Sequence, residues 1–224
     1  MKISCMDEQR EKRLGVFLGD VVSSRQIQDR DAFRGKVQGA CAKINAQFSS
    51  QLFADFKILK GLDEIGGVLT GIEPLYKIVT LISGQLQPVA MKFTFVRDYV
   101  DTALKTHDTA LMDGPAFHIA SSEITKLKSS NLMFYIKCQD EIIDSSIGGE
   151  INLILLIKKH WSAKQHEIVR LYEQVKSQKE VARLLQITQQ SVSQTLKSVM
   201  WKEIYGIEQG INKNLELYER SLTK

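Results

Sequence analysis

The chain has few of the residues that cross-link small folds or mark common enzyme motifs. Its 224 residues include three cysteines and three prolines. The cysteines lie far apart and show no C-x-x-C spacing, so the sequence indicates neither a disulfide framework nor a zinc site. This cysteine usage is typical of a reducing, cytoplasmic setting. The sequence also has no Walker loop, nucleophile elbow or H-E-x-x-H motif, which excludes the commoner enzyme classes.

Long hydrophobic runs are absent as well. The N-terminal stretch MKISCMDEQREKR has no apolar core of signal-peptide length. The longest apolar run, near Ile151–Ile157, is too short to cross a bilayer. An apolar content of 43% is nevertheless enough for a packed core. We therefore expect a soluble globular protein with one domain and a smaller second one, and no membrane partner.

Positive charge is concentrated in one segment. Between Ser162 and Lys202 there are seven basic and three acidic residues, an excess equal to the net charge of +4 for the whole chain. This excess indicates a polyanionic partner about as strongly as it indicates an ordinary solvated helical surface.

The periodicity of the first part of the chain predicts strands and helices in the order βαββαβ, followed by αβ. This order is typical of an antiparallel sheet with helices on one face, as in ferredoxin-like or palm folds. After Gly149 the chain is proline-free and helical by periodicity. The predicted fold class is α+β, with a palm-like sheet domain at 1–158 and an all-α domain at 159–224. The expected strands are 13–19, two within 54–71 around a turn near 61–64, 89–96 and 131–138.

Three helix starts follow one another in the C-terminal part. Ser162 with Gln165, and Ser177 with Glu180, have the capping-box spacing, and Thr188 is placed to cap a third helix. The segment EVARLLQITQQSVSQTL (180–196) resembles the helix-turn-helix of sigma-factor region four. The resemblance implies that the second helix of the motif enters the major groove of double-stranded DNA.

Exposed polar residues of that second helix are the expected DNA-contacting groups. Glutamine pairs with adenine, while lysine and serine contact phosphates or bases. Gln186 stands where such motifs often have glycine, and it takes the required conformation at some cost. The alternative is a three-helix bundle that serves only for packing. The candidate base readers are Gln189, Gln190, Ser191 and Gln194, and the candidate phosphate contacts are Lys179, Arg183 and Lys197.

The C-terminal tail carries a further apolar seam with spacings of three and four. This seam is suited to forming a homodimer, which would match two DNA half-sites, or to folding back on its own chain. Its members are Ile204, Ile207, Ile211, Leu215, Tyr218 and Leu222.

An aspartate closes the first predicted strand, in the segment FLGDVVSSR. Asp20 is costly there unless it is paired, hydrogen-bonded or metal-bound. The next acidic site, Asp63-Glu64, lies in the turn between the following two strands, so these carboxylates are candidates to hold Mg²⁺ or Mn²⁺. Ser23, Ser24 and Arg25 are placed to bind phosphate oxygens. Alternatively, Asp20 caps the following turn and pairs with Arg25.

Three segments resemble the bacterial SatD family: GDVVSSRQIQDR (19–30), GLDEIGGVL (61–69) and GPAFHIA (114–120). The family patterns are similar to those of palm domains in nucleotide cyclases, where two acidic positions bind metal ions for phosphoryl transfer. The present sequence departs from them, which implies altered or absent catalysis. The departures are Leu62 for glycine, Ile65 for phenylalanine, Gly66 for glutamine and Ser121 for arginine.

These patterns favour a cytoplasmic, transcription-regulating DNA-binding protein. Its palm-like N-terminal domain would sense a ligand, a nucleotide being the expected class. The alternatives are a metal-dependent nucleotide-processing or cyclase-like enzyme with eroded motifs, and a protein-interaction scaffold in which the acidic sites are structural.

Overall fold

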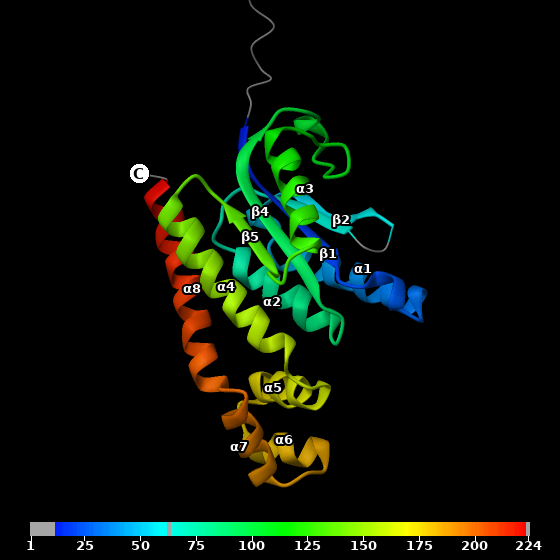
Figure 1. Cartoon of the computed structure of the whole chain (residues 1–224), viewed down its shortest axis with the longest axis vertical. Helices are drawn as coiled ribbons and strands as arrows, with labels where there is room; N and C mark the ends of the chain where they lie inside the picture. The colour runs from blue at the N-terminus through cyan, green and yellow to red at the C-terminus, as the bar shows by residue number, and fades with distance from the viewer. Residues whose placement is uncertain (1–11, 62–63, 223–224) are drawn as a thin grey trace, which may run out of the picture.

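The computed structural model describes residues 12–61 and 64–222, apart from the side chains of Lys12 and Arg25. Within this part of the chain, five strands form one sheet in the order β2-β3-β1-β4-β5 (Figure 1). The central strand β1 is antiparallel to both of its neighbours. The strands are β1 (Lys12–Val21), β2 (Leu52–Lys60), β3 (Glu64–Leu69), β4 (Met91–Val100) and β5 (Phe134–Lys137).

The expected antiparallel sheet is wrong for its last strand, because β5 runs parallel to β4. The reason is the crossover helix α3 (Pro115–Lys128), which carries the chain back so that β5 starts at the same end as β4. The sheet is therefore mixed.

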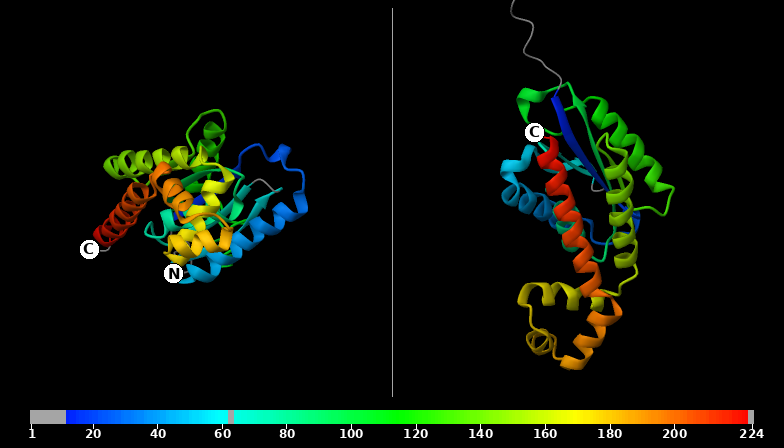
Figure 2. Two further views of the ribbon diagram at one scale, coloured as in Figure 1. Left: turned by 90° about the horizontal axis from the view of Figure 1, so that it is seen from below. Right: turned by 90° about the vertical axis from the view of Figure 1, so that its left-hand side faces the viewer.

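The expectation of helices on one face also needs correction, because helices cover both faces of the sheet (Figure 2). Side chains alternate along β1, so that Phe17 packs with α1 (Arg30–Gln47) and α2 (Leu75–Leu86), whereas Val16 packs with α3. The sequence did not reveal this because β1 is apolar on both sides, as is usual for a central strand.

A tight packing contact explains one glycine of β3. A side chain at Gly67 would collide with the ring of Phe56 on the neighbouring strand. The glycine is thus required by the close approach of an aromatic ring, and the strand forms in spite of its low intrinsic propensity.

Two long helices connect the sheet to three short helices at the other end of the molecule. Helix α4 (Glu141–Lys159) leads away from the sheet, and α8 (Trp201–Leu222) returns beside it (Figure 1). Ile204, Ile211 and Leu215 of α8 are buried in the same core as Phe17. The expected boundary at 158/159 falls one residue before the end of α4, while α8 packs in the core of the sheet domain.

The apolar seam of the tail therefore packs on its own chain. Ile204, Ile211 and Leu215 are buried and Tyr218 is partly buried against the same core. Ile207 and Leu222 remain exposed. Of the two uses expected for the seam, the structure shows the intramolecular one, because α2 and α4 present an apolar surface to it.

Three short helices form a separate small core between α4 and α8. They are α5 (Ala163–Val175), α6 (Gln178–Leu185) and α7 (Gln189–Ser198). No helix in the described part of the chain combines the length and apolar character that a membrane crossing requires. The buried residues of the small core are Ile168, Val169, Val181, Ala182, Val192, Leu196 and Val199.

Candidate nucleic-acid interface and sheet-edge site

The turn between α6 and α7 contains a glutamine in a left-handed conformation, which is costly for a residue other than glycine. Gln186 is left-handed, with φ 53° and ψ 43°. It closes α6 because the amide of Ile187 donates to the carbonyl of Ala182. A non-glycine residue in this region costs about 1 kcal/mol, so the turn is formed against a local preference.

The helix starts are capped by the residues that the sequence indicated. Ser162 accepts from the amide of Gln165, whose side chain accepts from the amide of Ser162, which completes the capping box. The hydroxyl of Thr188 accepts from the amide of Ser191 at the start of α7. These caps fix where the short helices begin.

The second expected capping box forms only in part. Ser177 accepts from the amide of Glu180. The carboxylate of Glu180 instead binds the guanidinium of Arg183, with nitrogen–oxygen distances of 3.0 and 2.6 Å. This contact lowers the pKa of Glu180 and raises that of Arg183. The expected phosphate contact Arg183 is thus already held by a carboxylate on its own helix.

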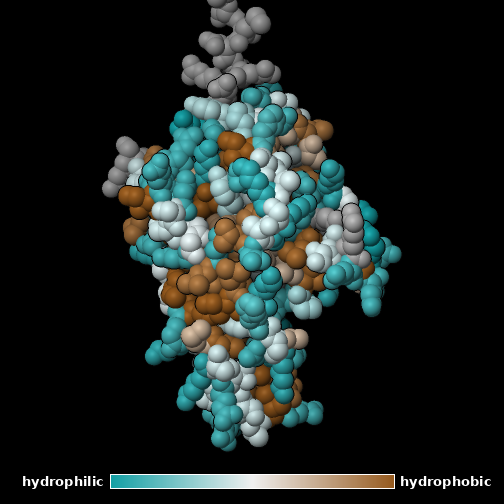
Figure 3. Space-filling view, viewed as in Figure 1, coloured by the Kyte–Doolittle hydropathy of each residue, from teal (hydrophilic) through white to brown (hydrophobic). Residues whose placement is uncertain are grey.

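The polar side of α7 faces away from the rest of the molecule. Val192 and Leu196 are buried against α5 and α6. Figure 3 shows mainly hydrophilic side chains over α7, at the free end of the molecule. The Ser191 hydroxyl is 2.8 Å from that of Thr188, so it also takes part in the cap. The exposed residues include Gln189, Gln190, Ser191, Gln194 and Lys197 of α7, and Lys179 of α6.

An aromatic cluster missed by the sequence reasoning joins α5 to α8. Trp201 packs edge-on against Tyr172 and stacks on Tyr205, with centroid distances of 4.8 and 5.2 Å. Its indole donates to Glu173 at 3.2 Å, and Lys176 lies over its ring. The spacing of Trp201 and Tyr205, one helical turn apart, was the available signal. The cluster connects the last turn of α5 to the first turns of α8.

The acidic residue at the end of β1 is buried and paired. Asp20 is 6% exposed, and its carboxylate is 2.7 Å from the ammonium of Lys128 at the end of α3. Lys92 is its cross-strand partner on β4 and donates to the carbonyls of Leu127 and Ser130. Burial lowers the pKa of Lys92, and Lys159 acts in the same direction, whereas Asp20 opposes it. Asp20 is therefore neutralised by cations that come from distant elements.

A cavity of about 510 Å³ opens beside this pair. Ser23 and Ser24 line it with Asp20, because the left-handed Ser23 (φ 56°) turns the chain into a short 3₁₀ helix, Ser24–Gln26. The side chain of Arg25 lies outside the described residues. Two ammonium groups, hydroxyls and one carboxylate line a space that suits a phosphate group.

The predicted metal ligands come together only in part. Glu64 is the direct cross-strand partner of Asp20, so both side chains lie on the same face of the sheet. Asp63 lies outside the described residues. Among the residues that the structure does describe, no group of three or more histidines, cysteines, aspartates or glutamates could hold a metal ion.

The GPA segment has a packing role. Gly114 has φ 145°, and a side chain there would lie 3.0 Å from the carbonyl oxygen of Tyr99. Pro115 follows as the first residue of α3, where its missing amide hydrogen is not needed. The segment thus seats the start of α3 against the end of β4.

Together, the mixed five-stranded sheet and its helices define an α+β protein with a sheet domain and a C-terminal helical region. The model of the SatD family matches residues 15–215. Since this match covers most of the chain, the protein belongs to the SatD family, as its motifs indicated.

The matching solved structures are distant from this chain in sequence. Two structures of a bacterial light-regulated adenylyl cyclase match with TM-scores of 0.41 and 0.36 and identities of 11% and 9%. Each match covers 57% of this chain and 43% of the other, so this chain spans less than half the length of those proteins. No curated protein matches the sequence.

Proposed function

We propose that the protein is a DNA-binding transcriptional regulator in which α6 and α7 form a helix-turn-helix of the sigma region-four kind. The supporting observation is the free polar side of α7, which carries Gln189, Gln190 and Gln194 at the end of the molecule. In such motifs the second helix enters the major groove with its N-terminal residues at the base edges.

The distribution of side chains on α7 favours this proposal over a purely structural role. A helix used only for packing within the chain needs its apolar side, and Val192 and Leu196 already provide it. The opposite side is rich in amide groups, which pair with adenine, and it ends at Lys197, whose charge suits a phosphate. Lys179 on α6 offers a second exposed cation.

The sheet domain takes the role of sensor in this proposal. Its core includes α8, which continues from α7, and α4, which leads into α5, so a change in the sheet domain reaches the DNA-binding helices through two connections. A ligand shifts this arrangement only if its affinity differs between the two states. A nucleotide is the ligand class that we propose.

The decisive experiment measures DNA binding by fluorescence polarisation at several salt concentrations, with DNA from upstream of the protein's own gene. Replacing Gln190 by alanine should reduce the preference for this DNA over unrelated DNA. Lys197→Gln should weaken binding to all sequences and lower the salt slope by about 1. Lys36→Gln on the exposed side of α1 is the matched control and should change neither quantity. Absence of binding even at low salt would remove the proposal.

A nucleotide-processing enzyme is the second candidate, and the cavity beside Asp20 is the observation that favours it. Lys92 and Lys128 would hold a phosphate there, and Asp20 with its cross-strand partner Glu64 would hold Mg²⁺ or Mn²⁺ once Lys128 leaves Asp20 for the phosphate. Incubation with nucleoside triphosphates and either metal tests this candidate. Unchanged nucleotide, together with no metal-dependent binding in calorimetry, would dismiss it.

A further inference from the structure

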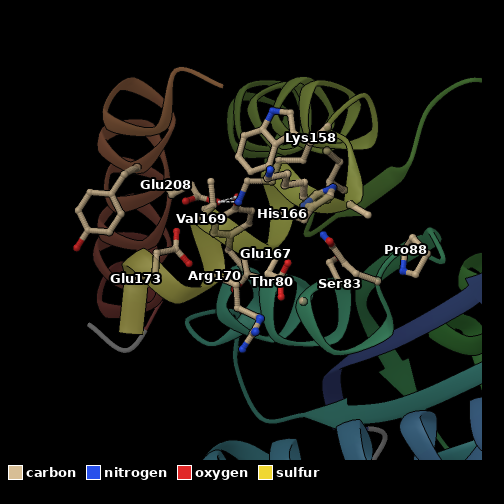
Figure 4. A pocket seen from close by; sticks show the side chains of 18 of the residues that line it. Thr80, Ser83, Pro88, Lys158, His166, Glu167, Val169, Arg170, Glu173 and Glu208 are labelled. Carbon is tan, nitrogen blue, oxygen red and sulfur yellow. Dashed lines mark hydrogen bonds and ion pairs between the residues drawn. The ribbon is translucent and has the colours of Figure 1, made fainter. Parts of the chain in front are cut away.

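A larger cavity lies where the sheet domain meets the helical end of the molecule. It has a volume of about 900 Å³, and its walls come from α2, α4, α5 and α8 (Figure 4). This volume lies at the upper end of the range for small-molecule sites, which are often found between domains. The cavity is separate from the one beside Asp20.

The inner part of the cavity carries hydrogen-bond acceptors. Glu208 of α8 is 8% exposed, and its Oε1 accepts from the hydroxyl of Tyr76 at 2.7 Å and from the ammonium of Lys158 at 2.6 Å. Its Oε2 has no hydrogen bond to a described residue. One turn further along α8, Asn212 donates to the backbone carbonyl of Glu208, which leaves its buried Oδ1 without a partner. These oxygens suit the N–H edge of a ligand.

The outer part of the cavity carries cations. Lys164 and Arg170 are exposed on α5, and neither forms an ion pair with a described residue. Glu167 lies between them and offsets part of their charge. Because Lys158 is neutralised by Glu208, the remaining lining charges give a net positive cavity, namely Lys164, Arg170 and Lys176 against Glu167 and Glu173.

A pair of aromatic rings also lines the cavity. The rings of Trp161 and His166 are 5.2 Å apart and tilted by 52°, and burial lowers the pKa of His166. In Figure 4, Ser83 of α2 faces His166 from the opposite wall. The cavity thus offers buried acceptors, an aromatic pair and exposed cations.

We propose that this cavity binds a nucleoside phosphate, with the base toward Glu208 and the phosphate toward Lys164 and Arg170. A free amino acid has a similar polarity but would leave most of the volume empty. Among the described residues, no hydrogen bond or ion pair joins α5 to α2, so the ligand supplies that connection. Binding would fix the orientation of α5–α7 relative to the sheet, which rests on the ligand-sensing role proposed above.

The test is direct binding of ribonucleoside monophosphates to the full-length protein, without DNA. Calorimetry measures affinity, and tryptophan fluorescence locates the site, because Trp161 and Trp201 are the two tryptophans of the chain. In a Trp201→Phe variant the signal comes from Trp161 alone, and it should change saturably. Adenosine and inorganic phosphate should each bind at least about tenfold more weakly than AMP, since each lacks one half of the recognised groups.

Charge variants separate this site from other cationic surfaces. Arg170→Gln should weaken AMP binding about tenfold while leaving adenosine binding unchanged. Lys36→Gln, which removes an exposed cation of α1 outside the cavity, is the matched control and should bind AMP as the unmodified protein does. Circular dichroism confirms that each variant is folded.

Two results would overturn the inference: no saturable heat or fluorescence change with any common ribonucleoside monophosphate up to about 5 mM, or an AMP affinity that Arg170→Gln does not alter. The DNA assay is independent of these measurements. Nucleotide binding without DNA binding would remove the regulatory function but keep the site, and the reverse result would remove the site only.

Discussion

The buried contact between Tyr76 and Glu208 allows one sharp test of how α8 is held. The Tyr76 side chain is 1% exposed, and its hydroxyl donates to the Glu208 carboxylate at 2.7 Å. Burial raises the pKa of Tyr76, and the negative charge of Glu208 raises it further, so this hydroxyl remains a proton donor throughout the accessible pH range. Tyr76→Phe removes the donor while keeping the ring in place.

The size of the effect follows from the charge of the acceptor. A hydrogen bond to a charged group contributes about 1.5–3 kcal/mol, and Lys158 remains as the other partner of Glu208 in the variant. We expect the free energy of unfolding to fall by about 2 kcal/mol. With a urea dependence of roughly 2 kcal/mol per molar, the midpoint should fall by about 1 M.

Urea unfolding followed by circular dichroism is the appropriate assay. Tyr135→Phe is the matched control, because Tyr135 is half-buried and its hydroxyl has no hydrogen bond to a described residue. The control should stay within about 0.5 kcal/mol of the unmodified protein. Equal unfolding curves for Tyr76→Phe and the control would refute the reasoning that this contact stabilises the packing of α8 on α2.

Three further outcomes are expected. Gln186→Gly should raise the free energy of unfolding by about 0.5–1 kcal/mol in thermal or urea melts, because glycine adopts the left-handed turn without strain. Burial lowers the pKa of His166 from its ordinary 6.5, so the unfolded chain binds more protons than the folded one at acidic pH, and the free energy of unfolding should decrease as the pH drops from 7 to 5. His166→Gln should flatten this decrease in melts over the same pH range. Burial raises the pKa of Cys41 to about 11 and that of Cys138 to about 12, so brief iodoacetamide treatment of the native protein, read by peptide mass spectrometry, should label neither thiol.

Features encoded by neighbouring residues could be predicted from the sequence. The hairpin of β2 and β3 follows from strand propensity on either side of Gly61, and the start of α7 follows from Thr188. A cap or a turn depends on a few adjacent residues, so its signal is present in a short window.

Features that depend on distant partners could not be predicted in the same way. Asp20 was recognised as costly, but its compensation by Lys92 and Lys128 arises only when β4 and α3 are placed beside β1. The apolar spacing of α8 predicted that this side of the helix would be buried. The spacing cannot tell whether another chain or α2 and α4 of the same chain bury it. The junction cavity has the same origin, since its walls come from four helices.

The path of α8 back to the sheet has a consequence for how this architecture diversifies. The α5–α7 unit leaves the sheet domain through α4 and re-enters it through α8, and these two helices lie side by side. The three short helices are therefore an insertion between two long helices that pack against each other. Any three-helix unit exchanged for residues 163–198 would have to reproduce the contact of Tyr172 with Trp201 to remain joined to α8.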